Sequence, residues 1–429
     1  MNSTVLRGVS LASTPGSGFE APPLRGAETQ TEGSAPRPSV YSALRDAGCS
    51  FRFRGTSALD RYFGLAGLPF MFAETPASLQ TLARFFDELR FPGPELADCA
   101  VFDGERDWYF FCTDETARDS VPRGFSDKAG FGRTGSLDVL DFFLEPETGR
   151  FLDPFGVYPL LKRIRQGAPV QSVPGLRWNG GLSAERNRFL LDAALILSRY
   201  DTRSFPPAVE LCAAAEKLDV ERPGTELQRI MLAAILLSER PDRGLELLKA
   251  AGFVETYWNE LALLDDAEHS KEFHPEGNAW KHTLETFRYR KTSGSGSLHD
   301  IRLSLGLLLH DIGKPLALSS GRNRFDGHAE LGAVAARRFL ERLEFPPELI
   351  SDVSYLVKNH MLPAALPRLP LSRTESIMSS RLFPVLLELY RCDESSSFKG
   401  LDQYYKSSAA YRQFLRRRKN PYRKEGKGI

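Results

Sequence analysis

Histidine and aspartate stand side by side twice in one short stretch of this chain, "SLHDIRLSLGLLLHDIGKP" (residues 297–315). The first pair is His299-Asp300 and the second is His310-Asp311. Imidazole and carboxylate groups together are ligands that divalent metal ions accept. A metal ion held in this way acidifies a bound water and shields a phosphoryl oxygen during in-line attack. Either pair is therefore a candidate for metal-assisted phosphoryl chemistry.

The two pairs have different settings in the sequence. The first follows the loop-like segment "RKTSGSGS", and Asp300 stands where an N-cap belongs, directly before "IRLSLGLLL". We therefore expect Asp300 to cap a helix and His299 to be an exposed loop residue. The second pair ends the leucine-rich run and is followed by Gly313. A charged pair at the end of an apolar helix is costly to bury alone, so it favours a cation over the alternative of a surface helix end.

More histidines and an aspartate flank the second pair, at intervals that let a helix and its connection intervene. The chain contains only seven histidines. Four of them fall at or beside predicted helix ends in one helical region: His282, His310, His328 and His360. His274, in "FHPEG", is more simply explained as a residue of a turn.

The pattern H…HD…D, with "LLLHDIGKP" around the central pair, resembles the HD superfamily of metal-dependent phosphohydrolases. The resemblance implies a primary metal site, with Asp311 as its catalytic residue, made of His282, His310, Asp311 and Asp393. Two-metal members of the superfamily place additional histidines where this chain has His328 and His360. The implied cofactor is one or two divalent ions of Mn, Ni, Co, Fe, Mg or Zn.

Lys314 lies one turn beyond the central pair. It is a candidate contact for a substrate phosphate. The simpler alternative is an exposed lysine at a helix end, which the helix dipole favours.

A second resemblance extends over most of residues 45–400. The segments "HPEGNAWKHTLETF" and "GHAELGAVAARRFLERLEFP" are similar to the HD domain of bacterial tRNA nucleotidyltransferases (CCA-adding enzymes) and related poly(A) polymerases. "ETGRFLDPFGVYPLLKRIR" resembles the end of their catalytic head, and "TELQRIMLAAILLSERPDRGLELLKAAGF" resembles their neck. The fold this implies is α+β: a small α/β head, an all-α neck and an all-α HD domain. The implied partners are a nucleotide or RNA substrate, with tRNA as a candidate.

The head departs from the family pattern at its glycine turn. The family needs a Gly-Gly turn followed by an Arg-Asp pair. In "RGTSALDRYFG" the residues Gly55, Asp60 and Gly64 keep the spacing, but Thr56 and Leu59 replace the second Gly and the Arg.

The departure at the metal ligands is larger. The D-x-D that binds two magnesium ions falls within residues 61–73, which contain no Asp or Glu and include Phe70, Met71 and Phe72. The nucleotide-selecting "EDxxR" reads "ERNRF". The sequence thus argues against nucleotidyl transfer and for a head kept for folding, RNA contact or dimerisation. An active transferase with displaced carboxylates is the alternative, with Asp138, Asp141 and Glu145 as candidates.

The whole sequence divides into five predicted segments. They are a disordered Ser/Pro/Gly-rich tail (1–40), the head (41–165), a helical neck (166–255), the HD domain (256–415) and a basic tail (416–429). In the head, "DWYFFCT" (107–113) and "VLDFFLE" (139–145) predict strands and "SLQTLARFFDEL" (78–89) predicts a helix. In the neck, "RNRFLLDAALILSRY" and "PAVELCAAAEKL" predict helices.

Composition narrows the class of protein. The net charge is +1 over 429 residues, so only local clusters could recruit nucleic acid. Five cysteines without a CxxC spacing predict a reducing cytoplasm. No apolar run is long enough to cross a membrane.

The leading hypothesis is a metal-dependent phosphohydrolase acting on a nucleotide, cyclic phosphate or RNA phosphoester. The alternative is an RNA-binding or tRNA-binding protein with a structural metal.

Overall fold

The computed structural model describes ten stretches of the chain. They are residues 40–46, 48–93, 95–113, 138–166, 183–200, 222–268, 277–291, 298–319, 325–397 and 400–419. The expected N-terminal tail before Val40, the predicted helix "PAVELCAAAEKL", His274 and the last ten residues lie outside these stretches.

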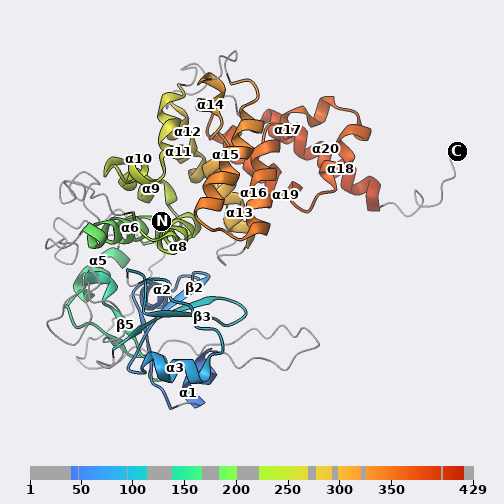
Figure 1. Ribbon diagram of the computed structural model, residues 1–429. Coiled ribbons are helices and arrows are strands. Elements are labelled where there is room, and N and C mark those ends of the chain that lie inside the picture. The colour runs from blue at the N-terminus through green and yellow to red at the C-terminus, as the bar shows by residue number, and fades with distance from the viewer. Residues whose placement is uncertain are drawn as a thin grey trace, which may run out of the picture.

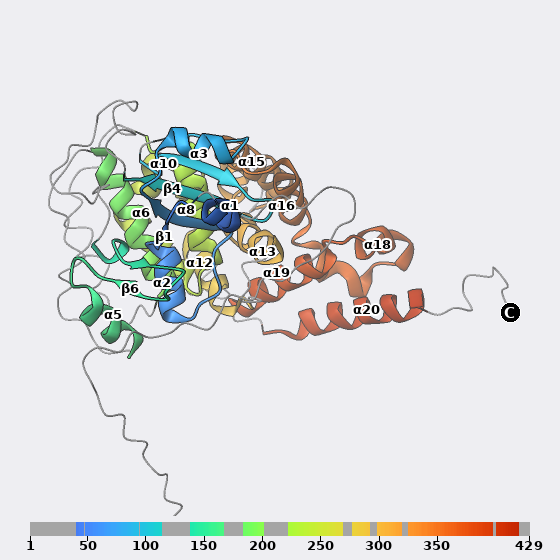
Figure 2. The ribbon, with the colours of Figure 1, turned by 90° about the horizontal axis from the view of Figure 1, so that it is seen from below.

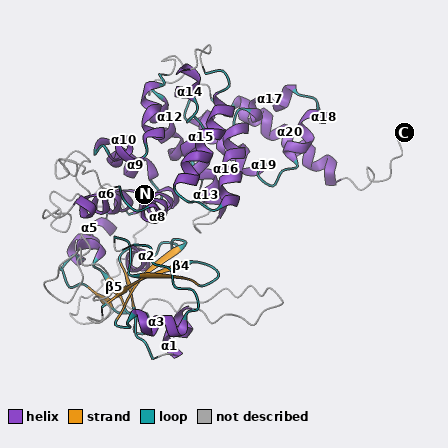
Figure 3. Cartoon of the chain, viewed as in Figure 1, coloured by secondary structure: helices purple, strands orange, loops and turns teal. Residues whose placement is uncertain are grey.

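Strands are confined to the N-terminal part of the molecule, and helices build the rest (Figure 3). The sheet has six strands in the order β3-β4-β2-β1-β5-β6. They are β1 (Arg52–Arg54), β2 (Phe70–Thr75), β3 (Cys99–Phe102), β4 (Asp107–Cys112), β5 (Phe143–Leu144) and β6 (Phe151–Leu152). β2 and β4 pair in parallel and the other neighbours are antiparallel. The α+β fold class expected from the sequence is confirmed.

The central strands are buried on both faces. Every residue of β2 is buried, and so is all of β4 except its first residue. Strands covered on both sides read as continuous apolar runs, as "DWYFFC" does. The covering helices of the head are α1 (Val40–Asp46), α2 (Thr56–Phe63) and α3 (Leu79–Phe85), with the 3-10 turn η1 (Asp138–Leu140) before β5. Two elements are shorter than predicted. The helix predicted over 78–89 ends at Phe85, and only two residues of "VLDFFLE" form a strand.

The helical neck lies against the sheet in the middle of the molecule (Figure 1). Its helices are α5 (Tyr158–Arg165), α6 (Ser183–Arg199), α8 (Thr225–Leu237), α9 (Pro241–Ala250), α10 (Phe253–Tyr257) and α11 (Asn259–Ala262), followed by η4 (Leu263–Asp266). α6 and α9 cross closely at Gly244, where a Cβ atom would lie 2.1 Å from Ser198 Oγ. A side chain at this position would separate the two helices.

The C-terminal helices surround α13 (Leu298–Leu309), which packs against α8, α12, α16 and α19. The other elements of this region are α12 (Ala279–Thr286), η5 (Phe287–Tyr289), α14 (Lys314–Ser319), α15 (His328–Arg342), α16 (Pro347–Asn359), α17 (Leu362–Ala365), η6 (Leu366–Arg368), α18 (Leu371–Met378), α19 (Phe383–Ser395) and α20 (Asp402–Lys419). No helix in the described stretches is long and apolar enough to cross a membrane.

Three sequence-based expectations about this region need correction. Asp300 does not cap α13 from outside, because the helix already begins at Leu298 and Asp300 lies buried in its first turn. His299 lies within the helix and not in the preceding loop. The predicted basic tail begins inside a helix, because α20 continues through Arg416 to Lys419.

Candidate metal centre

Four helix ends and one helix interior bring the predicted ligands together. His310 and Asp311 directly follow α13, His360 directly follows α16, and His328 is the first residue of α15. His282 lies within α12 and Asp393 near the end of α19. Gly313 makes this convergence possible, because a Cβ atom there would lie 2.0 Å from the His328 carbonyl oxygen.

Asp311 is the centre of the cluster. Its Oδ2 lies 3.3 Å from His310 Nε2 and 4.0 Å from His282 Nε2. Its Oδ1 lies 3.7 Å from His328 Nε2 and 4.0 Å from His360 Nε2. Two groups that could hold a metal ion therefore share one carboxylate, and each contributes two imidazoles.

Asp393 joins the first of these groups. Its Oδ1 lies 2.9 Å from His282 Nε2 and 3.9 Å from His310 Nε2. The structure thus brings together all six residues proposed for one or two metal ions: His282, His310, Asp311, Asp393, His328 and His360.

Backbone carbonyls orient three of the imidazoles. The Nδ1 atoms of His310, His328 and His360 lie 2.7–2.8 Å from carbonyl oxygens three residues earlier. A carbonyl oxygen only accepts, so each Nδ1 carries the proton and each neutral Nε2 presents a lone pair. A metal-binding histidine is commonly held in this tautomer by such a bond.

The lone pairs meet without a partner that could satisfy them. His328 Nε2 and His360 Nε2 lie 3.1 Å apart. The buried Nε2 of His310 has no hydrogen-bond partner among the described residues. Two facing lone pairs repel each other unless a proton or a cation lies between them, and a buried acceptor without a partner is costly. The donor set and its orientation fit a divalent metal ion.

The protonation states suit metal binding as well. Burial lowers the pKa of His360 to about 4, and burial also lowers the pKa of His328. Although burial opposes ionisation, the interaction with His310 and the charge of Lys314 hold the pKa of Asp311 well below its usual value. Burial also opposes ionisation of Asp393, but its hydrogen bond to His282 and the interaction with His310 lower its pKa. At neutral pH His328 and His360 are therefore neutral, and both carboxylates are ionised, as metal ligands must be.

Lys314 does not point into solvent. Its Nζ lies 2.6 Å from Asp311 Oδ2 and 5.2 Å from the ring centroid of Phe325. The proposed contact between Lys314 and a substrate phosphate stays a prediction. A phosphate bound to Lys314 would lie beside Asp311.

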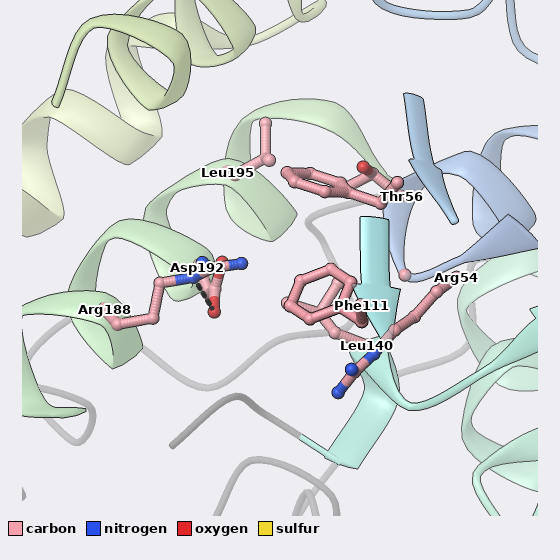
Figure 4. Close-up of a pocket in the computed structure, with 9 residues that line it drawn as sticks. Arg54, Thr56, Phe111, Leu140, Arg188, Asp192 and Leu195 are labelled. Carbon is pink, nitrogen blue, oxygen red and sulfur yellow. Dashed lines mark hydrogen bonds and ion pairs between the residues drawn. The ribbon is translucent and has the colours of Figure 1, made fainter. Parts of the chain in front are cut away.

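The head contains a small cavity between the sheet and α6, lined by residues of β1, β2, β4 and α6 (Figure 4). Its volume is about 20 Å³, which is room for about one water molecule. Phe72, from the segment 61–73 in which the family pattern places its D-x-D, is one of the lining residues. Arg188 and Asp192 of α6 also line the cavity, and Arg188 donates a hydrogen bond to Asp192 at 2.9 Å.

The buried carboxylates of the head are all engaged by arginines. Glu74 is bound by Arg52, Asp141 accepts from Arg54 at 2.5 Å, and Asp60 accepts two bonds from Arg199. Glu74 lies one residue beyond the segment 61–73 that the sequence analysis searched, and the all-buried strand was the signal that could have found it. Of the proposed displaced carboxylates, Asp138 begins η1 and Glu145 follows β5. Among the residues that the structure describes, the groups of side chains that could hold a metal ion lie in the HD domain.

Comparison with known proteins shows which family model and which relatives this chain matches. Residues 279–381 match the family model described as HD domain. The chain is 39% identical over 143 residues to the CC-adding tRNA nucleotidyltransferase of Thermus thermophilus, covering 32% of each chain. It is 30% identical over 225 residues to the Multifunctional CCA protein of Halorhodospira halophila, covering 51% of this chain and 50% of that one.

The Bacillus stearothermophilus CCA-adding enzyme in complex with CTP covers 87% of this chain and 80% of its own, with 14% identity and a TM-score of 0.44.

The names of these relatives correct the enzyme class expected from the sequence. The relative from Thermus thermophilus is named a nucleotidyltransferase, which overturns the expectation of an HD-type hydrolase whose sequence argues against nucleotidyl transfer. The aligned region spans only a third to a half of these relatives' own length. The chain carries an HD domain within a sequence related to the tRNA nucleotidyltransferases.

Proposed function

We propose that this protein binds tRNA and holds one or two divalent metal ions in its HD domain. The proposal of tRNA binding rests on one observation, which is the similarity to relatives whose names include tRNA. The metal is supported by the geometry of the cluster, above all by the two Nε2 atoms of His328 and His360 that face each other at 3.1 Å.

The residues fit the metal in two groups. His282, His310 and Asp393 would hold one ion with Asp311, and His328 and His360 would hold the other with the second oxygen of Asp311. A bound divalent ion supplies Lewis acidity and a strong local positive charge. The chain itself supplies the orientation, because the carbonyls of Leu307, Phe325 and Val357 fix the imidazole rings.

Metal content tests the second half of the proposal. The duplicated His-Asp pair offers a matched control, because Asp311→Asn and Asp300→Asn make the same chemical change at buried positions, one in the first turn of α13 and one just beyond its end. We expect purified full-length protein and Asp300→Asn to retain a divalent metal by elemental analysis, and Asp311→Asn to lose it. Equal metal content in both variants would contradict the site.

Binding of tRNA tests the first half. We expect fluorescence anisotropy to show binding of labelled tRNA by the full chain, with an affinity that falls steeply between 50 and 200 mM salt as phosphate contacts imply. Single-stranded RNA of the same length is the control. A protein that binds neither RNA at low salt would end the proposal.

The names of the relatives favour one activity as a second candidate, addition of nucleotides to the 3′ end of tRNA. Its assay is incorporation of labelled CTP or ATP into tRNA that lacks part or all of its terminal CCA. Incorporation would make this protein a transferase like its relatives. Failure beside a competent control enzyme would leave tRNA binding as the function.

A further inference from the structure

The C-terminal helices form a lobe that projects from the HD domain. It consists of α17, η6, α18 and α20, and we call it the C-terminal lobe. α20 packs against α17, η6, α18 and α19. In two perpendicular views this lobe extends away from the neck and the sheet (Figures 1 and 2).

One side of α20 is committed to this packing. Phe414 and Ser407 are buried, and Ser407 Oγ donates to the Pro363 carbonyl at 2.7 Å. The ring of Tyr411 lies 4.5 Å from that of Phe383. The apolar side of the helix is therefore covered within the chain and does not need a partner.

The opposite side of α20 is exposed and basic. Its residues recur at three- and four-residue spacing, so they form one stripe along the helix. The exposed stripe consists of Tyr405, Lys406, Ala409, Arg412, Gln413, Arg416 and Arg417. From Tyr405 to Arg417 it is roughly 18 Å long at the rise of an α-helix.

Acidic side chains do not neutralise this stripe. α20 contains six basic residues and a single acidic one, Asp402. Exposed Arg368 and Arg373 add to the charge of the lobe. None of the stripe's basic residues, nor Arg368 or Arg373, forms a salt bridge in the described part of the chain, whereas neighbouring Arg381 pairs with Asp352 at 2.8 Å. The local excess is marked in a chain whose net charge is only +1.

The helix dipole explains part of the pattern but not all of it. Arginines in the last turn, such as Arg416 and Arg417, are favoured by the partial negative charge of a helix C-terminus. That effect fades beyond the last turn, so it does not account for Lys406, Arg373 or the exposed ring of Tyr405, which is 57% exposed. A partner with a regular array of negative charges accounts for the whole stripe.

We propose that the stripe on α20 binds the phosphate backbone of a double-stranded RNA stem. This inference rests on the proposed function and assigns its surface. The exposed side chains of a helix reach phosphates, and duplex RNA is recognised mainly through its backbone and shape. Arginine guanidinium groups bind phosphate oxygens in pairs of hydrogen bonds, and the Tyr405 hydroxyl is a further donor.

The test compares two triple variants with the same change in net charge. Arg412→Gln, Arg416→Gln and Arg417→Gln together remove the stripe's arginines. Arg84→Gln, Arg150→Gln and Arg338→Gln together remove three exposed arginines from other parts of the molecule, none in a salt bridge in the described stretches. Binding of the full-length proteins to labelled tRNA and to a generic RNA hairpin is measured at several salt concentrations, with circular dichroism confirming the fold.

We expect the stripe variant to bind both RNAs at least about tenfold more weakly. Its salt slope should fall by about two to three, since each phosphate contact contributes about 0.9. The control variant should bind within about twofold of wild type. Equal affinities for wild type and stripe variant would overturn the inference and leave tRNA binding intact. Wild-type binding to the hairpin through the stripe, without tRNA binding, would support the inference while refuting the proposed function.

Discussion

At the scale of residues, the positions of individual atoms determine whether the centre can bind a metal ion. His328 and His360 each donate Nδ1–H to a carbonyl oxygen, and this leaves two Nε2 lone pairs facing each other at 3.1 Å. The arrangement is unfavourable in the metal-free protein because a proton is held poorly there: burial lowers the pKa of both rings. A cation relieves the repulsion without requiring either histidine to be charged.

The lowered pKa of His360 predicts how metal-free protein responds to acid. The unfolded chain takes up the proton near pH 6.5 and the folded chain only near pH 4, so the unfolded state binds more protons between these values. Stability is therefore fully present above about pH 6.5 and is lost as the pH falls towards 4, on the order of 3 kcal/mol for this residue.

Urea denaturation in the presence of a chelator, at steps from pH 7 to pH 4, measures this loss. His360→Gln should flatten the profile, because it removes the group whose protonation is linked to unfolding. A profile equally steep in His360→Gln would contradict the assignment.

At the scale of elements, the centre depends on how closely helices approach. Gly313 lets the segment after α13 touch the first turn of α15, since a Cβ atom there would lie 2.4 Å from Gly332 N and 2.0 Å from His328 O. Gly306 has the same role between α13 and α19, with Leu389 Cδ1 2.8 Å from the position of a Cβ atom. Small residues inside a helical region thus hold its ligands at binding distance.

Gly313→Ala should separate α15 from Asp311. Backbone atoms cannot yield as a side-chain end does, so we expect a loss of about 1–3 kcal/mol in unfolding free energy, typical of overpacking. We also expect weaker metal retention, because His328 moves with its helix. Thermal or chemical denaturation and elemental analysis measure the two effects.

Gly67→Ala is the matched control for that experiment. Its Cβ atom would meet only Arg106 Nη1, at 3.9 Å, which is ordinary contact. If both alanine variants were as stable as wild type, the close packing at Gly313 would not be a constraint.

At the scale of the molecule, ion pairs join the head to the neck. Arg199 of α6 donates to both carboxylate oxygens of Asp60 in α2, at 2.6 and 2.7 Å, and Tyr200 donates to the same group at 3.0 Å. Glu226 of α8 accepts from Tyr109 of β4 at 2.8 Å and from Arg90 at 3.0 Å. The head is thereby attached to the helices that pack against the HD domain.

Arg199→Met should weaken this attachment strongly. It leaves the Asp60 carboxyl buried without its cation, and burial raises the pKa of Asp60. Removing one partner of a buried pair costs about 3–5 kcal/mol. Arg84→Met removes an exposed arginine of the head and should cost almost nothing. Denaturation curves of both variants measure the difference, and equal stabilities would mean that the pair does not hold the head to the neck.

The sequence was sufficient for the broad fold and, through a family resemblance, for the ligand set. The leucine run that ends in His310-Asp311 and the histidines at helix-length intervals favoured a metal site, and the resemblance to the HD superfamily implied the six ligands that lie together in the structure. The aromatic run 107–113 was enough to predict β4. Local patterns succeed here because helix and strand periodicity depend on neighbours in sequence.

Other features depended on contacts between residues far apart in the chain. Sequence reasoning made Asp300 a cap, and it did not foresee that Lys314 contacts Asp311 or that Arg54 and Arg199 neutralise carboxylates 87 and 139 residues away. It also assigned Arg416 and Arg417, which end the basic stripe on α20, to a basic tail. Helix ends, ion pairs and exposed faces are set by which elements pack together, and burial then decides which charges require a partner. For that physical reason only the tertiary structure could show that two metal groups share Asp311.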